Sequence, residues 1–240
     1  MFVWCGHLGE LLTIADSKRA FHQAFPYVIP SLYRRTADEL LVELHLLSHQ
    51  KHFQVDALFA VGLKQVFNAF TTGYKPEGHL ETLFSALCSC NGFDSAQLRQ
   101  LADSSEAAVQ GHSIDDVQRW LRDKGDGAPE AMAKVLERAD HENFHYSRLM
   151  AVGLLTLLAK AQGQEGTEPS ELAKMAHELS EPLGLAKDRV QKDLGIYTSN
   201  LERMAQAVEL MEETLAAERR KRERQDEAAS QDSSAAESSN

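Results

Sequence analysis

Apolar residues recur with the period of an α-helix along almost the whole chain, and no convincing alternation of apolar and polar residues predicts a β-strand. The most regular pattern is a heptad stripe near the C-terminal end, formed by Val190, Leu194, Tyr197, Leu201, Met204, Val208, Met211 and Leu215. No proline follows Pro182, so nothing forces a break in the helix that this stripe predicts over 187–224. Gly195 is a weak point, because glycine costs about 1 kcal/mol inside a helix and favours a bend or a division there.

The predicted helix is about 57 Å long at about 1.5 Å per residue, which exceeds the depth of a body of this size. We therefore expect its far end to project, while its first half packs along the body. The apolar stripe ends at Leu215, and the basic run Arg219-Arg220-Lys221-Arg222-Glu223-Arg224 follows it. A projecting helix that changes from apolar to charged is suited to contact another molecule, as coiled coils do.

Shorter amphipathic helices are predicted before this one, over 17–25, 30–51, 57–72, 76–91, 95–110, 114–122, 129–139, 145–161 and 169–183. Candidate N-caps are Asp56, Asp94 or Ser95, and Ser113 with Asp116. The prediction is an all-α protein. It comprises a variable N-terminal extension at 1–15, a helical bundle at 16–185, a long, partly projecting coiled-coil helix at 186–224, and a disordered tail at 225–240 that lacks large apolar residues.

The composition favours a soluble globular protein, since 43% of the 240 residues are hydrophobic and 25% are charged. The net charge of −11 argues against nucleic acid as the main partner, because a polyanion requires a cationic surface. The longest apolar stretch, 149–159, is well short of the roughly 20 residues that a bilayer requires. Neither a secretory signal nor a transit peptide is predicted, so we expect the protein to act where it is made.

The three cysteines are Cys5, Cys88 and Cys90, an odd number that suits a reducing compartment. Cys88 and Cys90 are too close in sequence for an ordinary disulfide loop and lack the Cys-x-x-Cys spacing of redox motifs. We expect them to be small residues of a helix.

Two histidine patterns are candidate metal sites. His45, His49 and His52 share one flank of a predicted helix, and neutral imidazoles at such spacing bind zinc, but no carboxylate completes the set. Glu142 and His145 form one Glu-x-x-His unit, whereas a di-iron bundle needs two such units and two further glutamates. The alternative for the three histidines is a polar helix edge without metal, and for Glu142 and His145 it is a position at the entry to the predicted helix.

No phosphate-binding, dinucleotide-binding or nucleophile-elbow signature occurs, so the sequence predicts no catalytic residue, cofactor or small-molecule substrate. Basic residues cluster at three places, each of which is either a solvated face or a contact with a partner. Together with the end of the apolar stripe they form the candidate partner-contact set Lys18, Arg19, Arg34, Arg35, Met204, Val208, Met211, Leu215, Arg219, Arg220 and Arg222.

Three stretches of sequence resemble a known family. The first runs from Asp16-Ser17-Lys18-Arg19-Ala20-Phe21-His22-Gln23-Ala24-Phe25-Pro26 through Tyr33-Arg34-Arg35 to Asp38-Glu39-Leu40-Leu41-Val42-Glu43-Leu44-His45-Leu46-Leu47. The others are Phe144-His145-Tyr146-Ser147-Arg148-Leu149 and Asn200-Leu201-Glu202-Arg203-Met204-Ala205-Gln206-Ala207-Val208-Glu209. In this order they are similar to the Thylakoid Formation family of oxygenic phototrophs, over roughly 16–224. Residues 1–13 depart from the family pattern.

The resemblance implies a mostly helical protein, associated with photosystem II, on the cytosolic or stromal face of thylakoid membranes. It also implies a role in photosystem II biogenesis and repair and in accumulation of the FtsH protease. No catalytic residues carry over from the family, and the lack of a transit peptide favours a cyanobacterial member.

Three hypotheses follow from the sequence. The first is a non-enzymatic helical scaffold, peripheral to the thylakoid membrane, that docks on photosystem II subunits or on the FtsH complex. The second is a metal-binding helical protein that uses the flank of His45, His49 and His52, or Glu142 and His145. The third is a membrane-surface or nucleic-acid adaptor that works through the basic run at 219–224.

Overall fold

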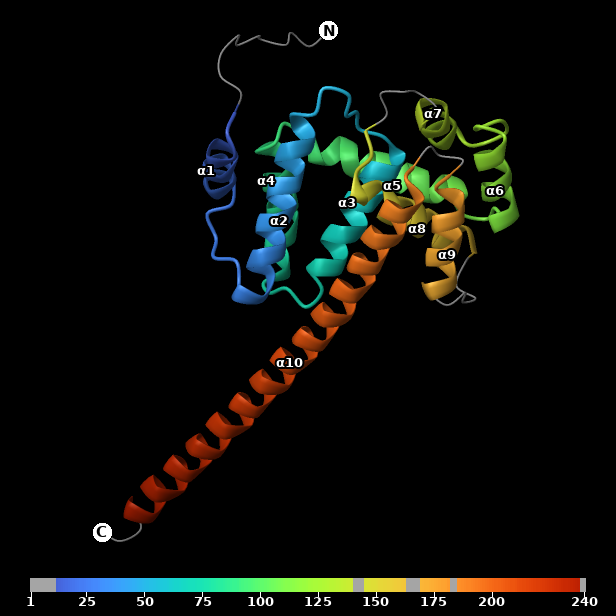
Figure 1. Cartoon of the computed structure of the whole chain (residues 1–240). Coiled ribbons are helices and arrows are strands. Elements are labelled where there is room, and N and C mark those ends of the chain that lie inside the picture. The colour runs from blue at the N-terminus through green and yellow to red at the C-terminus, as the bar shows by residue number, and fades with distance from the viewer. Residues whose placement is uncertain (1–11, 140–144, 163–168, 182–184, 238–240) are drawn as a thin grey trace. The chain divides into compact units, whose positions relative to one another are not determined.

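The computed structural model of the protein describes residues 12–139, 145–162, 169–181 and 185–237 (Figure 1). These residues form ten α-helices, a single 3₁₀ turn η1 and no β-strand, which confirms the predicted all-α class. The elements are α1 (Ile14–Ala24), α2 (Ser31–Ser48), α3 (Ala57–Phe70), η1 (Glu77–His79), α4 (Leu80–Ser89), α5 (Ser95–Val109), α6 (Ile114–Arg122), α7 (Glu130–Ala139), α8 (Arg148–Gln162), α9 (Pro169–Leu179) and α10 (Lys187–Glu237).

Side-chain caps fix several helix starts as the sequence predicts. The carboxylate of Asp56 accepts the Phe59 N–H at 2.9 Å, and Asp94, rather than Ser95, caps α5. Ser113 and Asp116 form a reciprocal capping box at α6. A second capping box, between Thr13 and Asp16, starts α1 at Ile14, so the predicted start at residue 17 was too late.

The chain divides into two compact units, residues 1–198 and residues 199–240. The boundary lies inside α10, about three turns after its first residue. The first three turns of α10 therefore belong to the helical bundle of the first unit. The predicted projection of the rest of the helix stays a prediction.

Helices α3 and α8 cross at the centre of the first unit (Figure 1). Both are rich in fully buried apolar side chains, among them Leu58, Phe59, Leu149 and Leu154. Gly62 of α3 lies against the backbone of α8 at Leu149, and Gly153 of α8 lies against the backbone of α3 at Leu58. The two missing side chains allow the helix backbones to approach closely. Around this pair, α5 packs on both helices, α1 on α2 and α4, and α9 on α8.

The C-terminal segment differs from the prediction. Helix α10 extends to Glu237, so the tail predicted to be disordered at 225–240 is helical over its described part. The reason is local. Residues 225–237 contain neither glycine nor proline, and alanine and glutamate are good helix formers. An existing helix also propagates at low cost, because only the first turn is expensive to form.

Candidate docking site on the long helix

Helix α10 is continuous from Lys187 to Glu237, through Gly195. The division expected at Gly195 is therefore absent, and a Cβ built on Gly195 would meet no heavy atom within 4 Å. The first turn is closed by the Arg189 and Val190 N–H groups, which donate to the Ala186 carbonyl at 2.9 and 3.0 Å. The hydroxyl of Thr198 donates to the Leu194 carbonyl at 3.1 Å and reinforces the ladder just beyond Gly195.

The first turns of α10 are anchored in the bundle by both apolar and polar contacts. Val190 and Leu194 are fully buried. The hydroxyl of Tyr146 donates to the Asp193 carboxylate at 2.9 Å, and the guanidinium of Arg189 lies 5.5 Å from the centre of the Tyr146 ring. Burial and the bond to Asp193 raise the pKa of Tyr146, so its hydroxyl stays protonated and able to donate.

An ion pair fixes the segment that carries Tyr146. Arg148, at the start of α8, contacts Glu43 of α2 through Nη2 at 2.6 Å and Nε at 2.7 Å, although 105 residues separate them. Burial raises the pKa of Glu43, and the Arg148 guanidinium offsets part of this effect. Helices α2, α8 and the root of α10 are thus tied together by the described part of the Phe144–Leu149 stretch.

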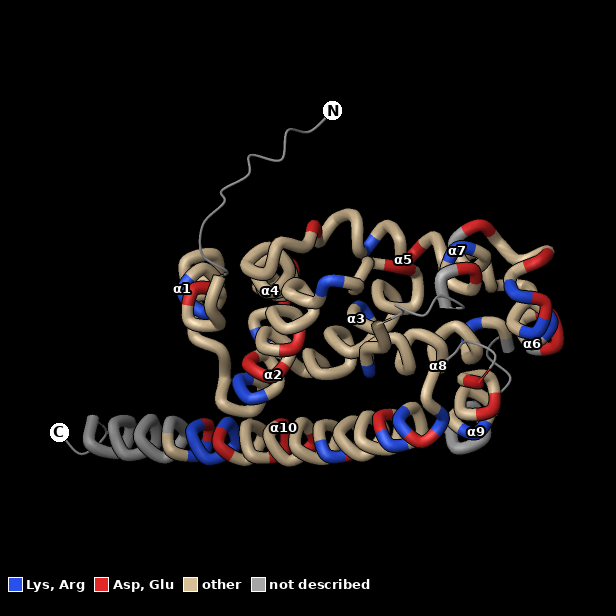
Figure 2. Tube along the Cα trace, turned by 45° about the horizontal axis from the view of Figure 1, so that its top comes forward, with Lys and Arg blue, Asp and Glu red and all other residues tan. Residues whose placement is uncertain are grey.

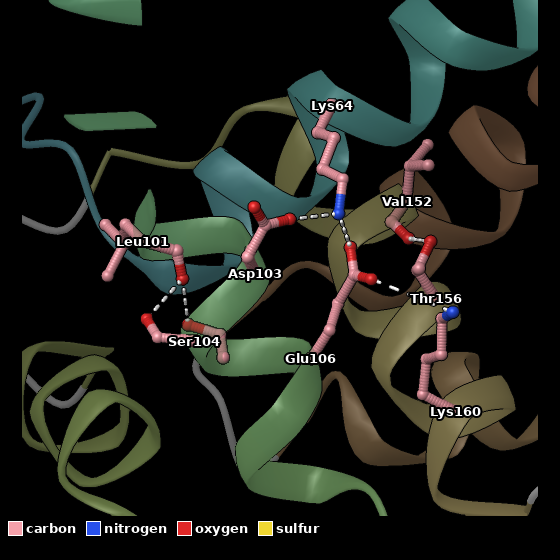
Figure 3. A network of polar contacts seen from close by, with 9 residues as sticks. Lys64, Leu101, Asp103, Ser104, Glu106, Val152, Thr156 and Lys160 are labelled. Atoms are coloured by element: carbon pink, nitrogen blue, oxygen red, sulfur yellow. Dashed lines mark hydrogen bonds and ion pairs between the residues drawn. The ribbon is translucent and has the colours of Figure 1, made fainter. Parts of the chain in front are cut away.

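A second charged network ties the middle of the bundle. The ammonium of Lys64 on α3 contacts Asp103 at 2.5 Å and Glu106 at 2.9 Å, both on α5 (Figure 3). Lys160 of α8 approaches Glu106 at 3.7 Å. Lys64 and Glu106 are largely buried, which makes the network a strut between three helices. Both lysines of this network are therefore paired with carboxylates of the protein itself.

The second unit carries the C-terminal half of the apolar stripe. Met204, Val208, Met211 and Leu215 recur along α10 at the predicted spacing. Leu215 is 46% exposed, whereas Met204 and Met211 are partly buried and Val208 is buried. Leu210, outside the stripe, is 64% exposed. No described helix is both long enough and apolar enough to cross a bilayer, and α10 fails on polarity rather than on length.

The basic run follows the stripe (Figure 2). Arg219, Arg220, Lys221, Arg222 and Arg224 are all exposed. Among the salt bridges of the described residues, none within 4.0 Å involves these five cations. In this they differ from Lys64 and Arg148 of the bundle, which pair with carboxylates.

The side chains of this run are distributed around the helix. A shallow hollow of about 410 Å³ is lined by Ala217, Arg220, Lys221, Arg224 and Gln225. These positions lie at i, i+3, i+4, i+7 and i+8, so they share one face of α10. Of the predicted contact residues only Arg220 lines this hollow. Lys221 and Arg224 were missed, although the period of the helix places them beside Arg220 in the sequence alone.

The other predicted basic contacts belong to the first unit and are mostly neutralised. Lys18 lies 4.0 Å from Asp38, Arg19 pairs with Asp16 at 2.9 Å, and Arg35 pairs with Glu39 at 2.9 Å. Arg34 donates to the backbone carbonyl of Ile29 at 3.3 Å. These pairs leave little net positive charge for a partner, and the role of the four residues in docking stays a prediction.

The histidine flank does not form a metal site. Among the residues that the structure describes, no group of three or more histidine, cysteine or acidic side chains is placed to hold a metal ion. His45 is buried and its Nδ1 lies 2.9 Å from the Ser17 hydroxyl, while Nδ1 of His49 lies 2.8 Å from the His45 carbonyl. The first contact joins α1 to α2, the second closes the C-terminal end of α2, and His52 lies outside the cluster. Glu142 lies outside the described residues.

Comparison with known proteins gives a consistent result. A family model described as thylakoid formation protein matches residues 13–226. A protein named Thf1 from Prochlorococcus marinus (strain MIT 9313) is 61% identical over 222 residues, covering 92% of this chain and 91% of that protein. The Thf1 protein of Parasynechococcus marenigrum (strain WH8102) is 56% identical over 219 residues, covering 90% of this chain and 95% of its own.

The fold agrees with the sequence relationship. A solved structure of Psb29 superposes with a TM-score of 0.77 at 35% sequence identity, and the match covers 88% of this chain and 99% of that one. The all-helical architecture and the sequence of nearly the whole chain therefore have the same relatives. The chain belongs to the thylakoid formation protein family.

Proposed function

We propose that this protein is a non-catalytic accessory protein of thylakoid formation that works by docking on a membrane-protein assembly. The assemblies that we propose are photosystem II, during its synthesis or repair, and the FtsH protease complex whose accumulation the protein would support. The proposed place of action is the cytoplasmic side of the thylakoid membrane, with peripheral association.

The observation that carries this proposal is helix α10. Its root is locked to the bundle through Val190, Leu194 and Asp193, whereas residues 199–240 form a separate unit with exposed leucines and a basic run that makes no salt bridge to a described residue. A helix that is firmly held at one end and offers apolar and charged groups along the rest is suited to bind another protein. The proposed docking residues are Met204, Val208, Met211, Leu215, Arg219, Arg220 and Arg222, with Lys18, Arg19, Arg34 and Arg35 as further candidates.

Two features support a role without catalysis. The Ser17–His45 pair is a possible nucleophile and base, yet the side chain of Ser17 is buried at 2% exposure and out of reach of a substrate. Burial also raises the pKa of the Cys88 and Cys90 thiols, which makes them poor nucleophiles.

The test is co-purification from cyanobacterial thylakoids with affinity-tagged protein in a mild detergent. We expect photosystem II subunits or FtsH subunits to be enriched with the full chain and lost with a chain that ends at Thr198. The variant Tyr146→Phe with Asp193→Asn weakens the root of α10 and should reduce recovery, whereas Arg35→Gln, which removes an exposed ion pair of α2, is the matched control. Equal recovery with and without residues 199–240 would refute docking through α10.

A further inference from the structure

The described cations differ in their partners. Lys64, Lys134 and Arg148 of the first unit pair with carboxylates, whereas others there, such as Lys51 and Lys192, form no salt bridge to a described residue. The basic run of α10 holds five cations and one carboxylate in six residues, and the described structure gives none of the five a salt bridge. In a chain with a net charge of −11, this short segment is thus a local concentration of positive charge.

The five cations of the basic run lie on two faces of α10. Successive residues of an α-helix are rotated by about 100°, so Arg220, Lys221 and Arg224 lie within about one third of the circumference, on either side of Ala217. Arg219 and Arg222 point to roughly the opposite side. Leu210 precedes Ala217 by seven residues and therefore lies on the same face as the three cations, where it is 64% exposed. The shallow hollow lined by Arg220, Lys221 and Arg224 lies on this face.

We propose that this face, made of Leu210, Ala217, Arg220, Lys221 and Arg224, binds an acidic amphipathic helix of a partner protein. The proposal rests on the proposed function and names the chemistry of the docking partner. The small side chain of Ala217 lets a second helix approach closely, with the cations on both flanks. Glutamates spaced by three and four residues on the partner would meet these cations. Leu210 would insert between the partner's apolar residues, about three turns from the nearest charged contact.

The charge of the whole chain favours a protein helix over the two extended polyanions. A membrane surface or a DNA duplex would interact with the acidic remainder of the chain as well as with α10, and the net charge of −11 opposes both. A single acidic helix contacts only the face that it covers, because charges more than about 8–10 Å away are screened at physiological salt. Helix α10 also lacks aromatic residues after Tyr197, which helices lying in a membrane interface commonly use as anchors.

The face extends from Leu210 to Arg224, about 21 Å along the helix axis. A partner segment of about 15 residues in helical form would cover it. The test therefore uses a fluorescein-labelled alanine-based peptide of about 28 residues, with glutamates at i, i+3, i+4 and i+7 on one face and a leucine about three turns from them on each side. A second peptide of the same composition, with the glutamates distributed around the helix, is the control for net charge.

Fluorescence anisotropy with the full chain measures binding of both peptides. The face variant replaces Arg220, Lys221 and Arg224 by Gln, and the matched variant carries Arg219→Gln with Arg222→Gln on the opposite side. Gln is a good helix former, so α10 should persist, which circular dichroism verifies. We expect the face variant to bind the one-faced peptide about tenfold more weakly than the matched variant and the wild type. Raising NaCl from about 50 to about 300 mM should weaken peptide binding only for the wild type and the matched variant, which keep the face.

Four results would overturn the proposal. They are no saturable binding of the one-faced peptide, equal binding of the two peptides, equal losses in the two variants, or tighter face-dependent binding of phosphatidylglycerol vesicles or a DNA duplex at the same salt concentration. The co-purification experiment separates this proposal from the proposed function. If photosystem II or FtsH subunits still co-purify while the one-faced peptide does not bind, docking stands and the assigned chemistry is wrong. If the one-faced peptide binds but photosystem II and FtsH subunits do not co-purify, the face binds acidic helices and the proposed docking on these assemblies is wrong.

Discussion

The crossing of α3 and α8 predicts that Gly62→Ala destabilises the protein even though alanine is the better helix former. A Cβ built on Gly62 would lie 1.8 Å from the Leu149 carbonyl oxygen, and that oxygen belongs to the backbone of α8. An ordinary contact needs about 3.4 Å, so the helices must separate by about 1.6 Å or deform. Neither can be achieved by a side-chain rotation.

The cost follows from the space that such a separation opens. A gap of about 1.6 Å over the roughly 100 Å² footprint of one crossing is on the order of 160 Å³, which at about 24 cal/mol per Å³ costs about 4 kcal/mol. Alanine returns about 1 kcal/mol through its helix propensity. We therefore expect the free energy of unfolding to fall by about 3 kcal/mol, and the melting temperature by about 6–12 °C for a chain of this size.

Gly195→Ala is the matched control, because a Cβ at that position meets no heavy atom within 4 Å. It should raise the stability of α10 by up to about 1 kcal/mol, the opposite sign from Gly62→Ala. Gly153→Ala, whose Cβ would lie 2.0 Å from the Leu58 carbonyl oxygen, should behave like Gly62→Ala. Urea unfolding followed by circular dichroism measures all three. If Gly62→Ala is as stable as Gly195→Ala, the reasoning about the crossing is wrong.

Three further predictions concern individual side chains. Burial raises the pKa of Cys88 to about 12 and that of Cys90 to about 11, so in a Cys5→Ser variant neither thiol should react with Ellman's reagent at pH 8 before denaturation; prompt labelling of the native protein would contradict this. Hydrogen bonds from Thr13 and Ser113 hold the pKa values of Asp16 and Asp116 below 3.8, so their stabilising effect is present above pH 3.8 and is lost as the pH falls through the lower folded pKa; an NMR titration that gives 3.8 or more for either group would refute it. Arg148→Met should lower the free energy of unfolding by about 2 kcal/mol, because Glu43 then loses its partner; the cost is smaller than for a fully buried pair because Arg148 is partly exposed. Urea unfolding measures this, and unchanged stability would show that the pair is not stabilising.

The features that were predictable from the sequence are those that depend on residues close together in the chain. Helix starts at Asp56 and Ser113 were predictable, because a cap and the N–H group that it binds are three residues apart. The helical period of the apolar residues likewise predicted the long helix, and the residues at 219–224 directly show its basic run. The end of α10 was placed too early, because composition suggested disorder at 225–240 where helix propensity prevailed.

Tertiary structure alone decided which groups meet across the fold. Glu43 and Arg148 are 105 residues apart, and Tyr146 and Asp193 are 47 apart, so no local spacing predicts either contact. The close approach at Gly62 and Gly153 likewise exists only once α3 and α8 cross. Local hydrogen bonds and periodicity act within a few residues of chain, whereas packing and charge pairing depend on distances in space. For that reason the sequence shows where the cations stand along the chain, and only the fold shows that Lys64 and Arg148 pair with distant carboxylates.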